Sequence, residues 1–375
     1  MIYVFSPLST ASPTLPGRIL PLLNKVAPNK LKIFALHHQE SLREITRFNQ
    51  YKIHYYDSML FIKNKDSKKY YSTFSLFRKA LLISLKTSLI ILKNFKKIEK
   101  IIFVKSQPIH FLPFLLAKIL NIFIIIDIDD IEFLSNKYPF PFFFRYVEEF
   151  LIKKSNLIIV ATPYLYRFYL PFNRSIHYIP TPINARTKLK QKKKTPKSDK
   201  LIKLSYFGSV SRKRLDILFE AFNVLHSQIQ EKYRLVIAGY GQDLSYYKNK
   251  YQPLVSAGVL SFFGEYTSHN LPSLLEETDV IVDPQPYNLE GKSKSSSRLL
   301  LANYYRKSFV TFRLKGSLAD ELLPINFPGF VDEYSVKSLV KTILYIDKKE
   351  AIPIFPIDNF LVENASKKYK KIVLR

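Results

Sequence analysis

The chain has 375 residues, of which 47% are hydrophobic and 15% aromatic, so it can form two ordinary hydrophobic cores and is not expected to be disordered. It contains no cysteine, which excludes disulfides, cysteine-ligated zinc and a thiol nucleophile. Lys and Arg number 58 against 30 Asp and Glu, and the formal charge of +28 attracts phosphate-bearing partners or anionic surfaces. The sequence shows no zinc-finger spacing, aromatic RNA-binding signature or basic-zipper heptad, so an anionic membrane surface is expected as partner and a specific nucleic acid is not.

Strands and helices are expected to alternate through the first half of the chain. The predicted strands cover 2–5, 31–35, 100–104, 122–126 and 157–161, and the predicted helices cover 17–26, 74–95, 112–120, 143–154 and 164–169. Such alternation with short connections predicts a doubly wound parallel sheet. The first residues lack the positive charge of a secretory signal, and the apolar stretch 111–126 is shorter than the ~20 residues that a bilayer core requires.

A linker is expected near the middle of the chain. Residues 178–184 contain two prolines that stop any helix, and 186–200 is a polar run dominated by Lys. We interpret this run as a solvated linker. Contact of the lysines with nucleic acid or lipid is the alternative.

The segment Tyr206–Asp216 joins an apolar strand to a basic helix start through Gly208. A glycine lets the backbone approach a phosphate closely, and Ser209 adds a hydroxyl. Arg212 and Lys213 lie where the N–H groups of a helix start already favour an anion. The segment therefore predicts a phosphate site. An ordinary turn with solvated basic residues is the alternative.

A second basic helix start is expected directly before the apolar helix that begins at residue 299. The run 292–298 supplies capping hydroxyls, backbone N–H groups and cations for a nucleotide diphosphate, with Lys294, Ser297 and Arg298 as its candidates. Placed opposite Lys213, it would hold the diphosphate from two sides. A flexible polar loop that merely caps the helix is the alternative.

The order of segments from residue 204 onward resembles the C-terminal domain of retaining GT-B glycosyltransferases of the family-4 type, the glycosyl transferases group 1. The resemblance is carried by the turn at Gly208, the strand and glycines of 233–241 with Gly239, and the segments 259–264, 271–284, 295–311 and 316–321. It implies an α/β GT-B fold, in which two Rossmann-like doubly wound domains face a cleft. It also implies metal-independent, retaining transfer from a nucleotide-sugar donor, without a cofactor.

The resemblance also divides the chain and suggests its location. It implies an acceptor domain over 1–182, the basic linker over 183–200, a nucleotide-sugar domain over 201–356, and a terminal helix over 357–375 that packs back on the first domain. A basic amphipathic helix lying on a membrane is another description of that last segment. We expect a glycan or lipid-linked acceptor and a peripheral position on the inner, cytoplasmic face of the membrane.

The chain departs from the family at its Glu-x7-Glu motif. Alignment on Arg298 places Ser293 at the first glutamate, near the donor sugar, and Leu301 at the second, on the nucleotide ribose. Glu290 is expected to reach the sugar from its loop instead. A catalytically degenerate GT-B protein that binds an anionic glycan or lipid is therefore the alternative function.

Candidate acceptor-side residues come from the first half of the chain. Asp127 and Asp129 follow a predicted strand, and His110 follows a neighbouring one, so all three are expected to face the cleft as catalytic or acceptor-binding groups. Capping of the next helix is the alternative for the two aspartates. Gly17 and Arg18 resemble the family's short glycine loop, which contacts acceptor or donor phosphate.

Overall fold

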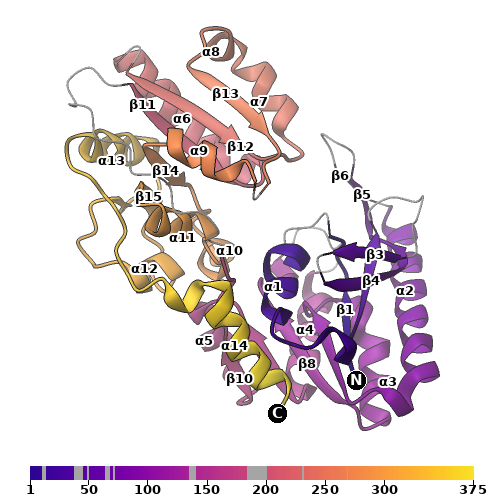
Figure 1. The fold of residues 1–375 in the computed structure, drawn as a ribbon. Coiled ribbons are helices and arrows are strands. Elements are labelled where there is room, and N and C mark those ends of the chain that lie inside the picture. Colours follow the sequence, from indigo (N-terminus) through magenta and orange to yellow (C-terminus); the bar gives the residue numbers. More distant parts are fainter. Residues whose placement is uncertain are drawn as a thin grey trace.

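The computed structural model describes residues 1–10, 14–37, 45–48, 50–63, 68–70, 72–134, 141–183, 201–229, 232–267 and 269–375. These residues form two units, each built on a parallel or mostly parallel sheet covered by helices (Figure 1). The prediction of two doubly wound α/β units is confirmed. Apart from Ile183, the predicted basic linker lies outside the described residues.

The first unit contains an eight-stranded sheet in the order β10-β9-β8-β7-β1-β2-β4-β3, in which only the β3–β4 pair is antiparallel. Its strands are β1 (Ile2–Ser6), β2 (Leu31–His37), β3 (Ile45–Phe48), β4 (Tyr51–Ser58), β7 (Lys100–Val104), β8 (Phe123–Ile128), β9 (Leu157–Val160) and β10 (Ile176–Tyr178). A separate hairpin is formed by β5 (Phe61–Lys63) and β6 (Lys68–Tyr70). The strand order reverses between β1 and β7, which is the switch point of this sheet.

Helices cover both faces of this sheet. Successive strand residues point to opposite sides, and the strands are apolar on both sides, so both faces need to be buried. Tyr3 and Phe5 contribute to the core under α2, α3 and α4, whereas Ile2 and Val4 contribute to the core under α1. The helices are α1 (Leu20–Leu23), α2 (Thr73–Asn94), α3 (Phe111–Ile119), α4 (Pro141–Lys154) and α5 (Pro163–Tyr169). The π-helix η1 (Leu15–Ile19) precedes α1, and the 3₁₀ helices are η2 (Pro28–Lys30), η3 (Phe95–Lys97), η4 (Pro108–His110) and η5 (Glu132–Leu134).

The second unit has a six-stranded parallel sheet in the order β13-β12-β11-β14-β15-β16, with its switch point between β11 and β14. The strands are β11 (Ile202–Phe207), β12 (Tyr233–Ala238), β13 (Leu260–Gly264), β14 (Val280–Asp283), β15 (Ser308–Phe312) and β16 (Phe330–Val331). The helices are α6 (Arg212–Gln228), α7 (Leu244–Lys250), α8 (Gln252–Ser256), α9 (Leu271–Glu277), α10 (Leu289–Ser293), α11 (Ser297–Tyr304), α12 (Leu318–Leu322) and α13 (Val336–Lys348).

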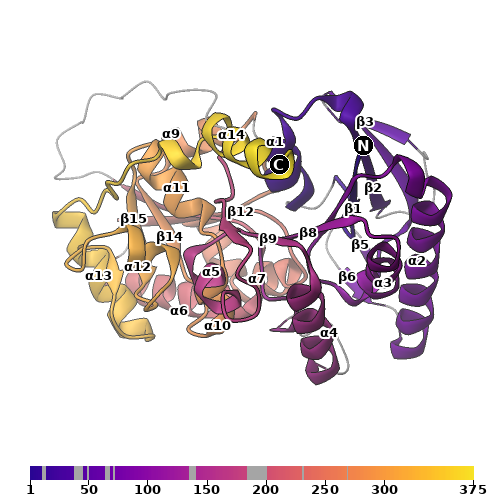
Figure 2. The same cartoon turned by 90° about the horizontal axis from the view of Figure 1, so that it is seen from below.

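The chain then returns to the first unit through η6 (Asp358–Phe360) and α14 (Val362–Val373). Phe360 belongs to the core of the second unit, whereas Tyr369 and Val373 are buried in the core beneath α1. Figure 2 shows α14 beside α1. A bridge between Ile183 and Leu361 joins this return to the outgoing chain. Among the described residues, no helix has both the length and the apolar character needed to cross a bilayer.

Candidate functional site

The switch point of the second sheet is built around two glycine turns. Gly208 follows β11 with φ +149°, and Gly239 follows β12 with φ +145°, a conformation that favours glycine. A Cβ on Gly239 would lie 1.8 Å from the carbonyl oxygen of Gly208, so the two turns pack backbone against backbone. The Gly208 N–H donates to the carbonyl of Ala238 at 2.9 Å, and the turn is thereby fixed.

Arg298 links the residue before the Gly208 turn to the end of β14. Its Nε donates to Asp283 Oδ1 at 2.7 Å and its Nη1 donates to the Phe207 carbonyl at 2.5 Å. The guanidinium also lies 4.9 Å from the ring centroid of Tyr206, and only 6% of the residue is exposed. Burial alone would lower the pKa of Arg298, but the Asp283 carboxylate outweighs it and raises that pKa.

This placement corrects the expectation that the Arg298 guanidinium holds a diphosphate. Two of its three nitrogens are engaged inside the unit, and its charge is compensated by Asp283. The Ser296 hydroxyl donates to the same carboxylate and caps the Leu299 N–H at the start of α11. Arg298 therefore acts as a brace between the end of β14 and the Gly208 turn.

The basic start of α6 points its three cations in different directions. Arg212 turns toward α7, with its guanidinium 4.7 Å from the ring centroid of Tyr246, and Lys213 is exposed. Arg214 instead is largely buried and its Nη2 donates to Glu290 Oε1 at 3.4 Å. The cation that reaches inward is thus Arg214, which the sequence analysis missed.

Charged groups of both units meet beside Glu290. Lys294 Nζ lies 3.9 Å from Glu290 Oε1 and 2.8 Å from Oδ1 of Asp130, which belongs to the first unit. Burial raises the pKa of Asp130, but the ammonium groups of Lys294 and Lys105 outweigh burial and hold that pKa well below its usual range. Of the two serines expected at the donor site, Ser209 is exposed and Ser297 is the first residue of α11. Arg214, Glu290, Lys294 and Asp130 therefore form one network across the two units.

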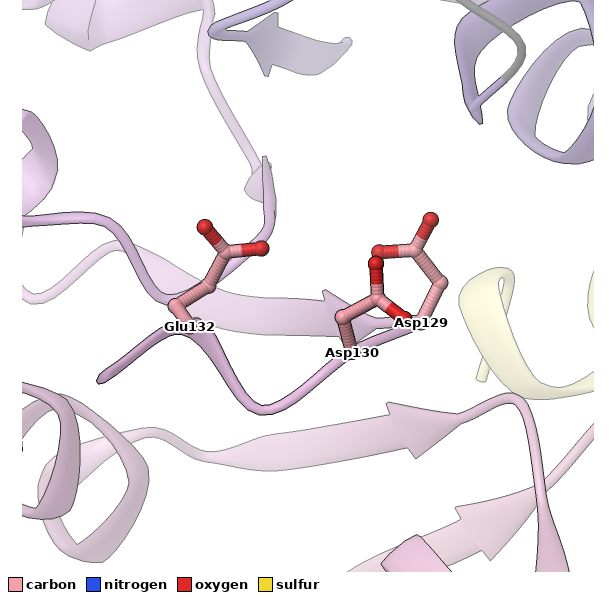
Figure 3. Close-up of side chains that lie close together, drawn as sticks. All are labelled: Asp129, Asp130 and Glu132. Carbon is pink, nitrogen blue, oxygen red and sulfur yellow. The ribbon is translucent and has the colours of Figure 1, made fainter. Parts of the chain in front are cut away.

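Three carboxylates gather between the end of β8 and the start of η5, where Asp129, Asp130 and Glu132 lie close together (Figure 3). The Nζ of Lys105 lies 2.8 Å from Asp129 and 2.6 Å from Glu132, and it is 3.5 Å from Asp130. Burial alone would lower the pKa of Lys105, but the carboxylates raise it well above its usual value. The lysine is therefore an internal cation, and a divalent ion between these carboxylates would have to displace it.

Asp127 and Arg18 form a buried ion pair, each with 1% of its surface exposed. Arg18 Nε donates to Asp127 Oδ1 at 2.8 Å, and its Nη1 donates to the Ile179 carbonyl at 2.9 Å. Burial raises the pKa of Asp127, although Arg18 opposes this. The expectation that these two side chains meet an acceptor is corrected, because they tie η1 and β8 to the end of β10. Gly17 is exposed, and no atom would obstruct a Cβ there.

His110 is a core residue, which corrects the expectation that it faces a cleft. Only 1% of it is exposed, and its ring centroid lies 4.8 Å from that of Phe103. The Nε2 atom lies 3.3 Å from the Val104 carbonyl. Burial lowers the pKa of His110 to about 4, so the ring is neutral near pH 7.

Glu148 on α4 is a buried acid that the sequence analysis did not single out. It accepts hydrogen bonds from the hydroxyl of Tyr169 and, at 2.9 Å, from the backbone N–H of Phe133. Burial raises the pKa of Glu148 to about 7. The adjacent Glu149 is partly exposed and pairs with Arg145, and the helical spacing of the apolar residues is the sequence signal that distinguishes the two glutamates.

The fold matches that of one class of protein. Residues 187–295 match the family described as Glycosyl transferases group 1, and no curated protein sequence matches the chain. The structure is similar to that of HepE of Anabaena, solved in complex with UDP-glucose, at 12% identity and a TM-score of 0.70 over 100% of this chain and 99% of that one. The predicted GT-B fold is thereby confirmed, and the protein is a glycosyltransferase.

Two further solved structures have the same fold. The lipopolysaccharide outer core galactosyltransferase WaaB is 12% identical with a TM-score of 0.66, over 100% of this chain and 99% of that one. Sucrose-phosphate synthase of Thermosynechococcus elongatus is 13% identical with a TM-score of 0.62, over 99% and 94%. At these identities the likeness defines the arrangement of both units and leaves the side chains of the site to be judged one by one.

Proposed function

We propose that the protein transfers a sugar, with retention of its anomeric configuration, from a nucleotide-sugar donor to a glycan or lipid-linked acceptor at the cytoplasmic face of a membrane. The observation that carries the proposal is the network of Arg214, Lys294 and Glu290 beside Asp130, between the two units. HepE was solved with UDP and with UDP-glucose, which favours a uridine diphosphate sugar as donor.

The departing diphosphate needs positive charge that is present before the reaction begins. Arg214 and Lys294 supply two cations on side chains that are 16% and 23% exposed, and the N-terminal ends of α6 and α11 add partial positive charge. Both cations contact Glu290 in this structure, so a diphosphate would compete with that carboxylate. Glu290 is then released toward the hydroxyl groups of the donor sugar.

The acceptor side of the proposal rests on Asp129 and Asp130, whose side chains are 14% and 28% exposed. Both come directly after β8 in the sheet of the first unit, and the Lys294–Asp130 ion pair joins this loop to the donor-side network. Their carboxylates can accept hydrogen bonds from acceptor hydroxyls and orient them toward the sugar. Retention requires the acceptor to approach from the face that the diphosphate leaves.

A degenerate GT-B protein without turnover is a second candidate, because of two residues at the family's glutamate positions. Ser293 is 1% exposed and donates its hydroxyl to the Glu290 carbonyl, while Leu301 packs against the core of the second unit. Neither of these two residues offers a carboxylate to a ribose. In this candidate the basic network holds an anionic glycan or lipid instead.

Calorimetric titration of the full chain with a panel of nucleoside diphosphates tests the two candidates. We expect base-selective binding that Arg214→Ala weakens about 10- to 150-fold, the equivalent of a charged hydrogen bond of about 1.5–3 kcal/mol. Lys213→Ala is the matched control, since it removes the same charge one residue away on an exposed side chain, and it should leave the affinity within about twofold.

The outcomes separate clearly. Absence of binding to every nucleoside diphosphate, with binding to anionic glycans retained, supports the degenerate candidate. Equal losses in the two variants would mean that general charge, and not the Arg214 site, attracts the ligand. For an active enzyme, NMR of the product's anomeric proton shows directly whether configuration is retained.

A further inference from the structure

The outer face of the 22-residue helix α2 presents a row of large apolar side chains to solvent. The row consists of Phe74, Phe77, Leu81, Leu85, Leu89 and Leu92, with exposures from 43% at Leu81 to 78% at Phe74. Their spacing of three or four residues places them on one side of the helix. We call these six residues the α2 row.

The opposite side of α2 is already buried. Leu76, Ile83, Thr87 and Ile91 lie there, and Ile83 and Ile91 join cores of the first unit. A surface helix of a soluble protein needs only one apolar face, so a second one along its whole length calls for a partner. The helix is about 33 Å long at 1.5 Å per residue, and the row runs along most of that length.

The neighbouring α4 also exposes aromatic side chains. Phe142, Phe143 and Tyr146 near its start are 58–69% exposed. Helices α2, α3 and α4 contact each other in sequence and cover the same face of the sheet, as Figures 1 and 2 show. The outward sides of α2 and α4 therefore both point away from that sheet face.

Charge decides which partner fits the α2 row. Residues 73–97 contain six basic residues and no acidic residue, the basic ones being Arg78, Lys79, Lys86, Lys93, Lys96 and Lys97. Lys86 pairs with Asp57, whereas Arg78 and Lys93 are exposed beside the row. A second copy of this chain would bring two basic helices together, and like charges would repel. An anionic surface with an apolar interior satisfies both features.

We propose that the α2 row, with the aromatic start of α4, rests in the interfacial layer of a membrane containing anionic lipids. The apolar side chains enter the boundary between headgroups and acyl chains, and the basic side chains beside them meet the lipid phosphates. The proposal names the surface by which the protein would bind the membrane. It rests on the membrane position in the proposed function and on no other part of that function. It requires neither sugar transfer nor nucleotide binding.

Flotation of the full chain with lipid vesicles tests the proposal. We expect the protein to float with vesicles of phosphatidylglycerol and phosphatidylcholine, and to bind vesicles of phosphatidylcholine alone much more weakly. The triple variant Phe77→Ser, Leu81→Ser, Leu85→Ser should lose at least about tenfold in partitioning, because each removed side chain forfeits apolar burial. All three are at least 43% exposed, so we expect the variant to keep the fold.

A matched triple variant controls for the general loss of apolar surface. Phe263→Ser, Ile325→Ser, Ile354→Ser removes three exposed apolar side chains from the second unit and should float like the parent. Nucleoside diphosphate binding, measured on the same proteins, separates this proposal from the donor site. Loss of nucleotide binding in all of them would contradict the proposed function and leave the flotation result standing.

Three results would overturn the proposal. The first is a parent protein that does not float with anionic vesicles. The second is an α2 variant that floats as well as its parent. The third is a dimer in lipid-free buffer that the α2 variant abolishes, because the row would then belong to a second copy of the chain.

Discussion

Replacing Arg298 with alanine should destabilise the second unit, because it leaves the Asp283 carboxylate buried without its cation. The two side chains are 8% and 1% exposed, and their Nε–Oδ1 distance is 2.7 Å. Removing one partner of such a buried pair costs about 3–5 kcal/mol. For a domain of 150–250 residues this lowers the melting temperature by about 6–20 °C, at about 2–4 °C per kcal/mol.

Circular dichroism in the far ultraviolet is a suitable assay, since the chain has no tryptophan to serve as a fluorescent probe. The double variant Arg298→Met, Asp283→Asn should recover most of the loss, because it removes both buried charges. Arg234→Ala, an exposed arginine on β12, should change stability by no more than about 0.5 kcal/mol. If Arg298→Ala melts like the parent but no longer binds nucleotide, Arg298 contacts the ligand and the bracing role assigned here is wrong.

Two further predictions concern the buried acid and the glycine turns. The pKa of Glu148 is raised from 4.5 to about 7, so the folded chain keeps this proton after the unfolded chain has released it, and stability from this group is lost as pH rises through that window. The free energy of unfolding of Glu148→Gln, measured by urea titration, should therefore rise by about 3 kcal/mol relative to that of the parent between pH 4.5 and 7. A difference between variant and parent that does not change with pH would contradict the assignment. Gly239→Ala should lower the free energy of unfolding by about 2–6 kcal/mol through overpacking and strain. Gly258→Ala should lower it by about 1–2 kcal/mol, because Gly258 has a positive φ but open space where the new Cβ would lie. Equal thermal shifts in the two glycine variants would mean that the Gly208 carbonyl can move aside.

His110 masks the effect of Glu148 in the parent protein. Burial lowers the pKa of this histidine to about 4 from 6.5, so the unfolded chain binds its proton more readily and stability rises with pH over nearly the same window. The contributions of Glu148 and His110 to the pH dependence of stability therefore have opposite signs. For that reason the prediction is made on the difference between variant and parent.

The strands and the turn at Gly208 were predictable because their signals are local. A run of apolar residues followed by glycine and a helix start predicts a strand, a turn and a helix from neighbouring residues alone. The structure has β11, Gly208 and α6 in that order. Its role in binding phosphate stays a prediction. The inward position of Arg214 was missed, although the apolar stripe of Leu215, Leu218 and Phe222 already places Lys213 on the opposite side of the helix.

The partners of buried charges were not predictable, because they come from distant parts of the chain. Asp283 lies at the end of β14 and Arg298 at the start of α11, and nothing in their separation shows that they pair. Lys105 and the carboxylates after β8 meet only once β7 and β8 are adjacent. A lone histidine such as His110 gives the same sequence signal in a core as in a site.

The chain passes between the two units twice, after β10 and again at η6, and the Ile183–Leu361 bridge holds these two passages together. A rotation of one unit against the other would therefore be centred near this bridge, where the two crossings lie side by side. Such a swing would pull Lys294 away from Asp130, so the entry of a donor and the parting of that ion pair would be one and the same movement.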